Sequence, residues 1–146
     1  MSELRIVAGI DVGSACVKAL VLDNERQILG RAVVQTTGYF QQRIREALDN
    51  ALDEAQKVSS DLERICVTGF GAKCAEFADG VHVRDATCHA RGAFHHFPEP
   101  LTVVDLGSRD PTVIRVDDQG DRTDTRSLRK CAVGVGNFLT YAAKVL

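Results

Sequence analysis

The sequence predicts an α/β protein with a complete first lobe built on a mixed sheet, residues 1–98, and the beginning of a second lobe, residues 99–146. Two observations carry this prediction. Short β-branched segments occur in hairpin-sized groups in both parts of the chain, and a long amphipathic helical pattern separates them. After the prolines of "HHFPEP" the chain repeats its opening order of strand, Asp-x-Gly-Ser turn and strand. Strands that alternate with helices in this way are typical of α/β domains.

The first lobe is predicted to open with a three-stranded antiparallel meander. Residues 5–11, 17–22 and 28–36 are rich in β-branched side chains, and the segments between them are of hairpin length. A helix is expected within residues 41–59. Apolar side chains recur there with helical spacing, at Ile44, Ala47, Leu48, Ala51, Leu52 and Ala55.

Shorter elements complete the first lobe. A strand is expected from Glu63 to Gly69, followed by a turn and a short helix within "GFGAKCAEFA". The brief apolar piece "VHVRD" comes next. Residues 87–94, "TCHARGAF", are expected to be helical despite Gly92, which we interpret as a position of close packing.

The second lobe is predicted to begin with a second meander. "LTVVDLGSRDPTVIRVDDQGDRTDTRSL" contains three strands, a tight turn and a "DDQG" hairpin, and "KCAVGVGNFLTYAAKVL" leads into an apolar helix. That helix ends the sequence before a second sheet is complete. The pattern therefore indicates a truncated chain, a fragment, or a subunit that another polypeptide completes.

Composition narrows the classes of partner. The 146 residues carry 18 Lys and Arg against 20 Asp and Glu, without a basic run, so nucleic acid is not the favoured partner. No apolar segment approaches the roughly 18 residues that cross a membrane, and no secretory signal opens the chain, so we expect a cytoplasmic protein.

The cysteines form no C-x-x-C pair, which argues against a disulfide framework and a self-contained zinc site; they are Cys16, Cys66, Cys74, Cys88 and Cys131.

The repeated Asp-x-Gly-Ser turn predicts a clamp for a polyphosphate. One such turn is an ordinary hairpin bend, but two copies, each after a buried strand, favour a functional role. Asp11 and Asp105 are the expected catalytic residues, which would hold Mg²⁺ directly or through water and orient the attacking water. Backbone N–H groups, hydroxyls and one ammonium would bind the phosphates, from Gly13, Ser14, Lys18, Gly107 and Ser108.

Five segments together resemble one family. "GIDVGSACVKALVLD", "VTGFGAK", "DATCHARGA", "VVDLGSRD" and "KCAVGVGNFL" follow the order and spacing of the BadF/BadG/BcrA/BcrD-type ATPases. These are the ATPase subunits of benzoyl-CoA reductases and the activators of 2-hydroxyacyl-CoA dehydratases. The resemblance covers nearly the whole chain, and "TCHARGA" together with "KCAVGVGNFL" is its most specific part.

The resemblance implies ribonuclease H-like, actin-like lobes that clasp ATP, and hydrolysis that drives electron transfer to an acyl-CoA reductase or dehydratase component. It also implies a homodimer, or pairing with a related ATPase subunit, that shares a 4Fe-4S cluster. Cys131 matches the first cluster ligand, and a thiolate at a Gly-rich helix start is favoured by free N–H groups. Gly134 and Gly136 would line the nucleotide side of the second lobe, or only permit the helix turn. His89 falls in the family's "HA-x-G" pattern and is interpreted as structural.

Two alternatives to an electron-activating ATPase remain at this point. The second turn reads "DLGSRDPT", whereas the family usually has D-I-G-G-Q-D-S-K, so one backbone donor and one positive charge are absent there. This change is consistent with a non-catalytic structural or regulatory subunit that docks to a complete ATPase. A small-molecule kinase of the same superfamily is the third hypothesis, for which the sequence offers no recognisable base that would bind an acceptor.

Overall fold

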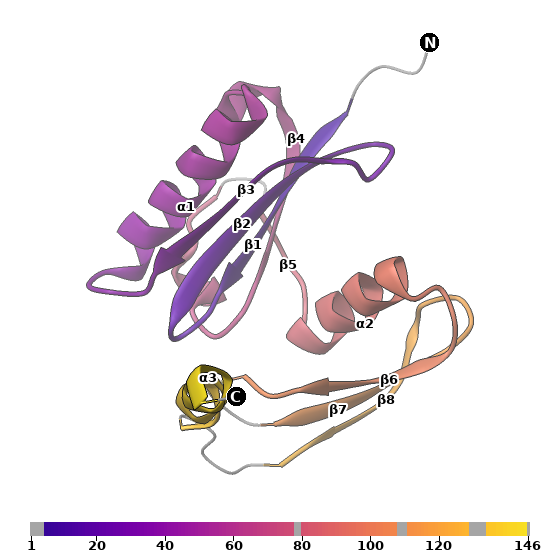
Figure 1. The fold of residues 1–146 in the computed structure, drawn as a ribbon. Coiled ribbons are helices and arrows are strands. Elements are labelled where there is room, and N and C mark those ends of the chain that lie inside the picture. Colours follow the sequence, from indigo (N-terminus) through magenta and orange to yellow (C-terminus); the bar gives the residue numbers. More distant parts are fainter. Residues whose placement is uncertain (1–4, 78–79, 108–110, 129–133, 146) are drawn as a thin grey trace. The chain divides into compact units, whose positions relative to one another are not determined.

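A computed structural model describes residues 5–77, 80–107, 111–128 and 134–145 (Figure 1). The chain divides into two compact units, Met1–Val83 and Arg84–Leu146, and each is described by itself. The division falls before helix α2 (Asp85–His96), which packs on strands of the second unit. The lobe boundary predicted from the prolines, after residue 98, lies beyond this helix.

The first unit contains a five-stranded mixed sheet of order β3-β2-β1-β4-β5. Its first three strands pair antiparallel, whereas β4 pairs parallel to β1, and β5 pairs parallel to β4. The predicted meander and mixed sheet are therefore confirmed. The strands are β1 (Ile6–Val12), β2 (Cys16–Asp23), β3 (Ile28–Gln35), β4 (Leu62–Thr68) and β5 (Gly80–His82).

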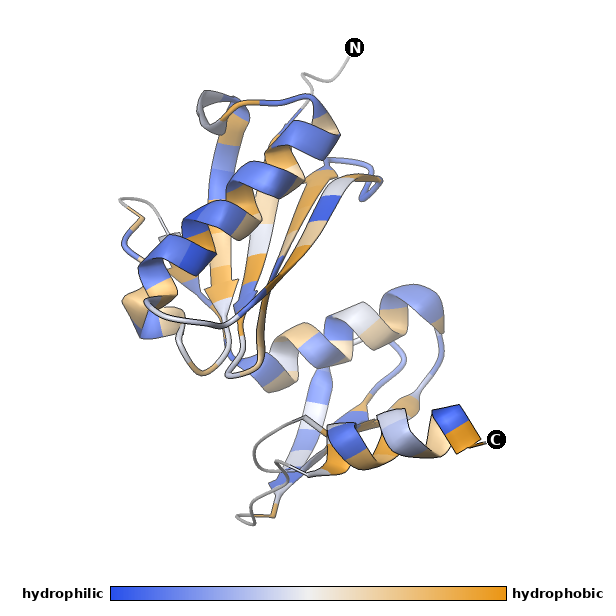
Figure 2. Ribbon diagram, turned by 60° about the vertical axis from the view of Figure 1, so that its left-hand side comes forward, coloured by the Kyte–Doolittle hydropathy of each residue, from blue (hydrophilic) through white to orange (hydrophobic). Residues whose placement is uncertain are grey.

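Helix α1 (Phe40–Ala55) covers one face of this sheet (Figure 1). Its apolar stripe faces the strands and its charged residues face outward, as the hydropathy colouring shows (Figure 2). The predicted apolar positions from Ile44 to Leu52 are buried in one core with alternate residues of β1 and β2. Two single turns of 3₁₀-helix, Ser59–Asp61 and Ala72–Cys74, flank β4, and the second stands where a short helix was expected.

Gly30 sets how closely α1 approaches β3. A Cβ at this position would overlap the carbonyl oxygen of Ala51 and lie 2.7 Å from the amide nitrogen of Ala55. The backbone of the helix, which cannot rotate away as a side chain can, thus occupies the space beside the strand. Close approach of the helix therefore requires glycine here.

We expect Gly30→Ala to lower the free energy of unfolding by about 3 kcal/mol, because the added methyl group pushes α1 off the sheet. Urea unfolding followed by circular dichroism measures the change. Gly9→Ala is the matched control, since Gly9 also lies in a strand and a Cβ there meets nothing within 4 Å. Equal losses in the two variants would show that packing against α1 is not the cause.

The second unit contains a three-stranded antiparallel sheet of order β6-β7-β8 and the helices α2 and α3. The strands are β6 (Leu101–Asp105), β7 (Thr112–Val116) and β8 (Arg122–Ser127), and α3 spans Val135–Val145. Ala90 of α2 is fully buried against Ile114 and Val116 of β7. The predicted second meander and both helices are confirmed.

Within the described ranges, no helix is both long and apolar enough to span a membrane.

Candidate functional site

The first Asp-x-Gly-Ser turn places Asp11 opposite Lys18. These residues are cross-strand partners near the ends of β1 and β2, and Lys18 Nζ lies 2.7 Å from Asp11 Oδ2. Buried and half-buried residues alternate along β1, so Asp11 points to the face of the sheet opposite α1. The side chains of Asp11 and Lys18 are 35% and 54% exposed, which leaves the pair accessible to a ligand.

The loop between β1 and β2 is held by hydrogen bonds from Thr36, the residue that follows β3. The Gly13 N–H donates to the carbonyl of Cys16 over 3.0 Å, and a Cβ on Gly13 would lie 2.7 Å from that same oxygen. Thr36, just after β3, donates its hydroxyl to the Gly13 carbonyl and its N–H to the Ala15 carbonyl, each over 2.9 Å. These hydrogen bonds hold the turn, which contains the exposed Ser14, in one conformation. The sequence did not indicate that Thr36 would donate two of them.

The end of β4 supports Asp11 from its other side. Gly69 follows β4 with a φ of +95°, and a Cβ there would lie 2.5 Å from Asp11 Oδ1 and 2.6 Å from the Val12 carbonyl oxygen. The Gly71 N–H donates to that Val12 carbonyl over 2.9 Å. The glycines of "VTGFGAK" therefore allow the backbone to pass directly beside the carboxylate. The sequence analysis expected the end of a strand and a turn here, and it assigned these glycines no contact with Asp11, because the parallel pairing of β4 with β1 was not predicted.

The second Asp-x-Gly-Ser turn follows β6, and Asp105 is the last residue of that strand. Asp105 Oδ1 accepts the Gly107 N–H over 3.0 Å, whereas Oδ2 lies 3.6 Å from His89 Nε2. The side chains of His89 and Asp105 are 42% and 29% exposed. Sequence reasoning gave His89 only a structural role and missed this proximity. Ser108 lies outside the described residues.

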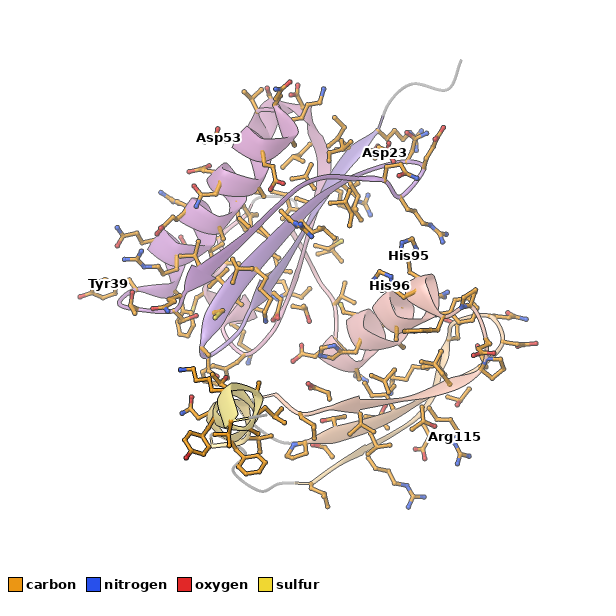
Figure 3. The ribbon with its side chains drawn as sticks, in the orientation of Figure 1. Asp23, Tyr39, Asp53, His95, His96 and Arg115 are labelled. Atoms are coloured by element: carbon orange, nitrogen blue, oxygen red, sulfur yellow. The ribbon has the colours of Figure 1, made fainter. Side chains whose placement is uncertain are left out.

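The β2–β3 hairpin has a well-defined hydrogen-bonded turn. Asp23 Oδ1 accepts the N–H groups of Glu25 and Gln27 over 2.9 and 2.8 Å, and Arg26 has a φ of +63° (Asp23 in Figure 3). Such an aspartate closes a tight turn by accepting from its own following backbone.

The β7–β8 hairpin repeats that turn atom for atom. Asp117 Oδ1 accepts the N–H groups of Gln119 and Asp121 over 3.0 and 2.8 Å, and Gly120 has a φ of +78°. The same number of residues separates Asp23 from Asp117 as separates the two aspartates of the Asp-x-Gly-Ser turns. The repeat predicted from one short motif therefore extends over a whole meander.

We expect Arg26→Gly to raise the free energy of unfolding by about 0.5 kcal/mol. The left-handed conformation costs a residue with a side chain about 1 kcal/mol, and the greater freedom of glycine in the unfolded chain offsets part of the gain. Urea unfolding measures the difference. Arg45→Gly, on the right-handed helix α1, is the control and should be destabilising instead. A loss of stability in Arg26→Gly would contradict the strain argument.

The other predicted positions are less constrained by their surroundings. Gly134 precedes α3 and accepts the Phe138 N–H over 2.9 Å, and Gly136 accepts the Thr140 hydroxyl over 3.0 Å. A Cβ on Gly92 would meet nothing within 4 Å, so the prediction of close packing there is wrong.

Cys131 lies outside the described residues. Among those described, no group of three or more His, Cys, Asp or Glu forms a metal-binding cluster.

Comparisons with known proteins agree on one family. A model of the BadF/BadG/BcrA/BcrD ATPase family matches residues 8–146. The activator of lactoyl-CoA dehydratase from Anaerotignum propionicum is 36% identical over 138 residues, which are 94% of this chain and 52% of that protein. A subunit of benzoyl-CoA reductase from Thauera aromatica is 32% identical over 148 residues, which cover 98% of this chain and 51% of that protein. The chain thus spans about half the length of the curated relatives it matches.

A solved structure supports the same relationship. The activator of 2-hydroxyisocaproyl-CoA dehydratase from Clostridium difficile, with bound ADPNP, superposes with a TM-score of 0.79 at 28% identity. The match covers 98% of this chain and 52% of that one. Together with the mixed sheet, it confirms the predicted α/β, ribonuclease H-like fold of the actin-like ATPases.

Proposed function

Because the chain belongs to the BadF/BadG/BcrA/BcrD ATPase family, we propose that it binds and hydrolyses Mg-ATP as an activator subunit, or as the N-terminal portion of one. Its hydrolysis would drive electron transfer to a 2-hydroxyacyl-CoA dehydratase or an acyl-CoA reductase, the enzymes served by the relatives. The observation that carries the proposal is the Asp11–Lys18 pair, which lies beside a hydrogen-bonded turn on the face of the sheet opposite α1.

The residues of the first turn suit a polyphosphate bound with Mg²⁺. Backbone N–H groups at a glycine turn and a lysine ammonium are the donors that phosphate oxygens require. The Asp11 carboxylate offers hard oxygen ligands, which Mg²⁺ prefers, and it is partly exposed, with the backbone of Gly69 close beside it. Mg²⁺ would supply neutralisation of the phosphate charge. The Lys18 ammonium contacts the Asp11 carboxylate in this structure. When nucleotide binds, it would also contact a phosphate oxygen and would lie less close to Asp11.

The second turn is proposed to supply the group that orients the attacking water. Asp105 is the last residue of β6, and one oxygen of its carboxylate accepts a hydrogen bond from the Gly107 N–H of the turn. Gly107 and Ser108 would bind phosphate beside it, and Gly134 and Gly136 would line the nucleotide side of the same unit. Asp11 would thus hold Mg²⁺, and Asp105 would orient the attacking water.

Cys131 is proposed to be one ligand of a 4Fe-4S cluster shared between two copies, or with a related ATPase subunit. A cysteine before a helix start, in the sequence "KCAVGVG", suits a thiolate ligand because free N–H groups favour its charge. The cluster would supply one-electron chemistry. Anaerobic purification, with an iron count on the wild type and on Cys131→Ser, tests this assignment; iron retained in Cys131→Ser would exclude it.

Calorimetry of the 146-residue chain with Mg-ADPNP tests the nucleotide site. We expect saturable binding that requires Mg²⁺, together with release of phosphate from ATP in a parallel assay. Binding without phosphate release would favour the alternative, a non-catalytic structural or regulatory subunit. The replacement of Ser-Lys by Pro111-Thr112 favours that alternative, because proline has no N–H to offer a phosphate. Co-purification with a larger ATPase would support it further.

We expect Lys18→Ala to weaken Mg-ADPNP binding by about tenfold, because an ammonium that contacts phosphate is removed. Calorimetry at two salt concentrations measures the affinity, and the salt dependence should decrease with the lost charge. Lys144→Ala, an exposed lysine in α3, is the control and should bind as the wild type does. Equal affinities of Lys18→Ala and the wild type would remove Lys18 from the proposed phosphate site.

A further inference from the structure

Three residues of helix α2 fix its register on the second sheet. Ala90 is fully buried against β7. Arg91 donates to the Gln119 carbonyl over 2.9 Å and pairs with Asp121 Oδ1 over 2.5 Å, both in the β7–β8 hairpin. One turn further along the helix, the ring of Phe94 lies where a Cβ on Gly120 would approach it to 2.7 Å. The helix can therefore neither slide nor rotate without losing these contacts.

This anchoring determines where His89 lies. His89 directly precedes the buried Ala90 and the paired Arg91, so its Cα is fixed beside the carboxyl end of β6. Its Nε2 atom is 3.6 Å from Asp105 Oδ2, while Asp105 Oδ1 is held by the Gly107 N–H. Each oxygen of this carboxylate therefore faces a separate nitrogen atom, the amide of Gly107 from its own turn and Nε2 of His89 from α2.

We propose that His89 is a positioning residue for Asp105, which keeps the carboxylate in the orientation required for hydrolysis. A carboxylate fixed through one oxygen can still rotate about its side-chain bonds, and an imidazole with its proton on Nε2 would favour the orientation in which the other oxygen faces the ring. The separation of 3.6 Å exceeds a direct hydrogen bond, so the attraction acts through space between the carboxylate and the ring nitrogen. The inference rests on the proposed function, because it concerns the residue that orients the attacking water.

Steady-state hydrolysis of ATP by the 146-residue chain is the primary test. We expect His89→Ala to lower kcat by about tenfold to a hundredfold and to leave KM within about twofold, because the nucleotide is held mainly by other groups. His89→Gln should recover part of kcat, since its amide also offers an N–H. His95→Ala is the control, an exposed histidine on the same helix (Figure 3), and should behave as the wild type. An unchanged kcat in His89→Ala overturns the proposal.

An NMR measurement separates this inference from the proposed function. The amide resonance of Gly107 reports on the Asp105 carboxylate that it contacts. We expect that resonance to shift in His89→Ala and not in His95→Ala. If the wild-type chain does not hydrolyse ATP, the proposed function fails, and the Gly107 resonance then decides the positioning contact alone. A Gly107 resonance that is the same in all variants overturns the contact, whatever the activity.

Discussion

Asp11→Asn is expected to lower ATP hydrolysis by about a hundredfold or more, which corresponds to roughly 2.7 kcal/mol of transition-state stabilisation. Asparagine has nearly the same shape, so it fits beside Gly69 as the carboxylate does. It removes the negative charge that would hold Mg²⁺ and balance Lys18. Phosphate release in the presence of saturating Mg-ATP measures the effect.

Stability should change little in this variant. The Asp11–Lys18 pair is substantially exposed, and ion pairs of this kind contribute about 0–1 kcal/mol. Asp53→Asn is the matched control, because Asp53 lies exposed on the outer side of α1 (Figure 3). Activity of Asp11→Asn equal to that of Asp53→Asn would remove Asp11 from the proposed mechanism.

Gly69→Ala is expected to lower the free energy of unfolding by about 2–4 kcal/mol and also to weaken Mg-ADPNP binding. Two causes combine here. A φ of +95° disfavours any residue with a Cβ, and that Cβ would meet the backbone of Val12 and the carboxylate of Asp11. The backbone of Val12 cannot yield as a side chain can, so the end of β1 must move. Urea unfolding and calorimetry measure the two effects.

Gly38→Ala separates these causes. Gly38 also has a positive φ, of +80°, but a Cβ there meets nothing within 4 Å. It should therefore show the conformational strain alone, about 1 kcal/mol, with nucleotide binding unchanged. If both variants lose equal stability and bind nucleotide equally, the contact between Gly69 and Asp11 has no part in positioning the carboxylate.

The elements that the sequence predicted well are those in which local pattern and tertiary burial agree. Apolar residues at helical spacing in α1 face the first sheet, and the alternation in β1 and β2 places every second residue of these strands in the same core. The Asp-x-Gly-Ser turns lie between hairpin strands for the same reason, since a short glycine turn closes only neighbouring antiparallel strands.

The supporting residues of the site could not be predicted from the sequence because they come from distant segments. Gly69 reaches Asp11 only through the parallel pairing of β4 with β1, which no local pattern encodes. His89 reaches Asp105 only because α2 packs in one register on β7. A glycine after a strand and an isolated histidine are both common in sequences. Neither indicates which residue it will contact, because that contact depends on the tertiary fold.

The two matching hairpins, β2–β3 and β7–β8, have a consequence for how the chain folds. The hydrogen bonds that Asp23 and Asp117 make within their own turns join residues at most four positions apart, so each turn can close without any distant contact. Hairpins form within about 1–10 μs, far faster than a whole domain with parallel strands. We therefore expect each unit to begin folding at its own aspartate-closed hairpin, with the parallel addition of β4 as a late step in the first unit.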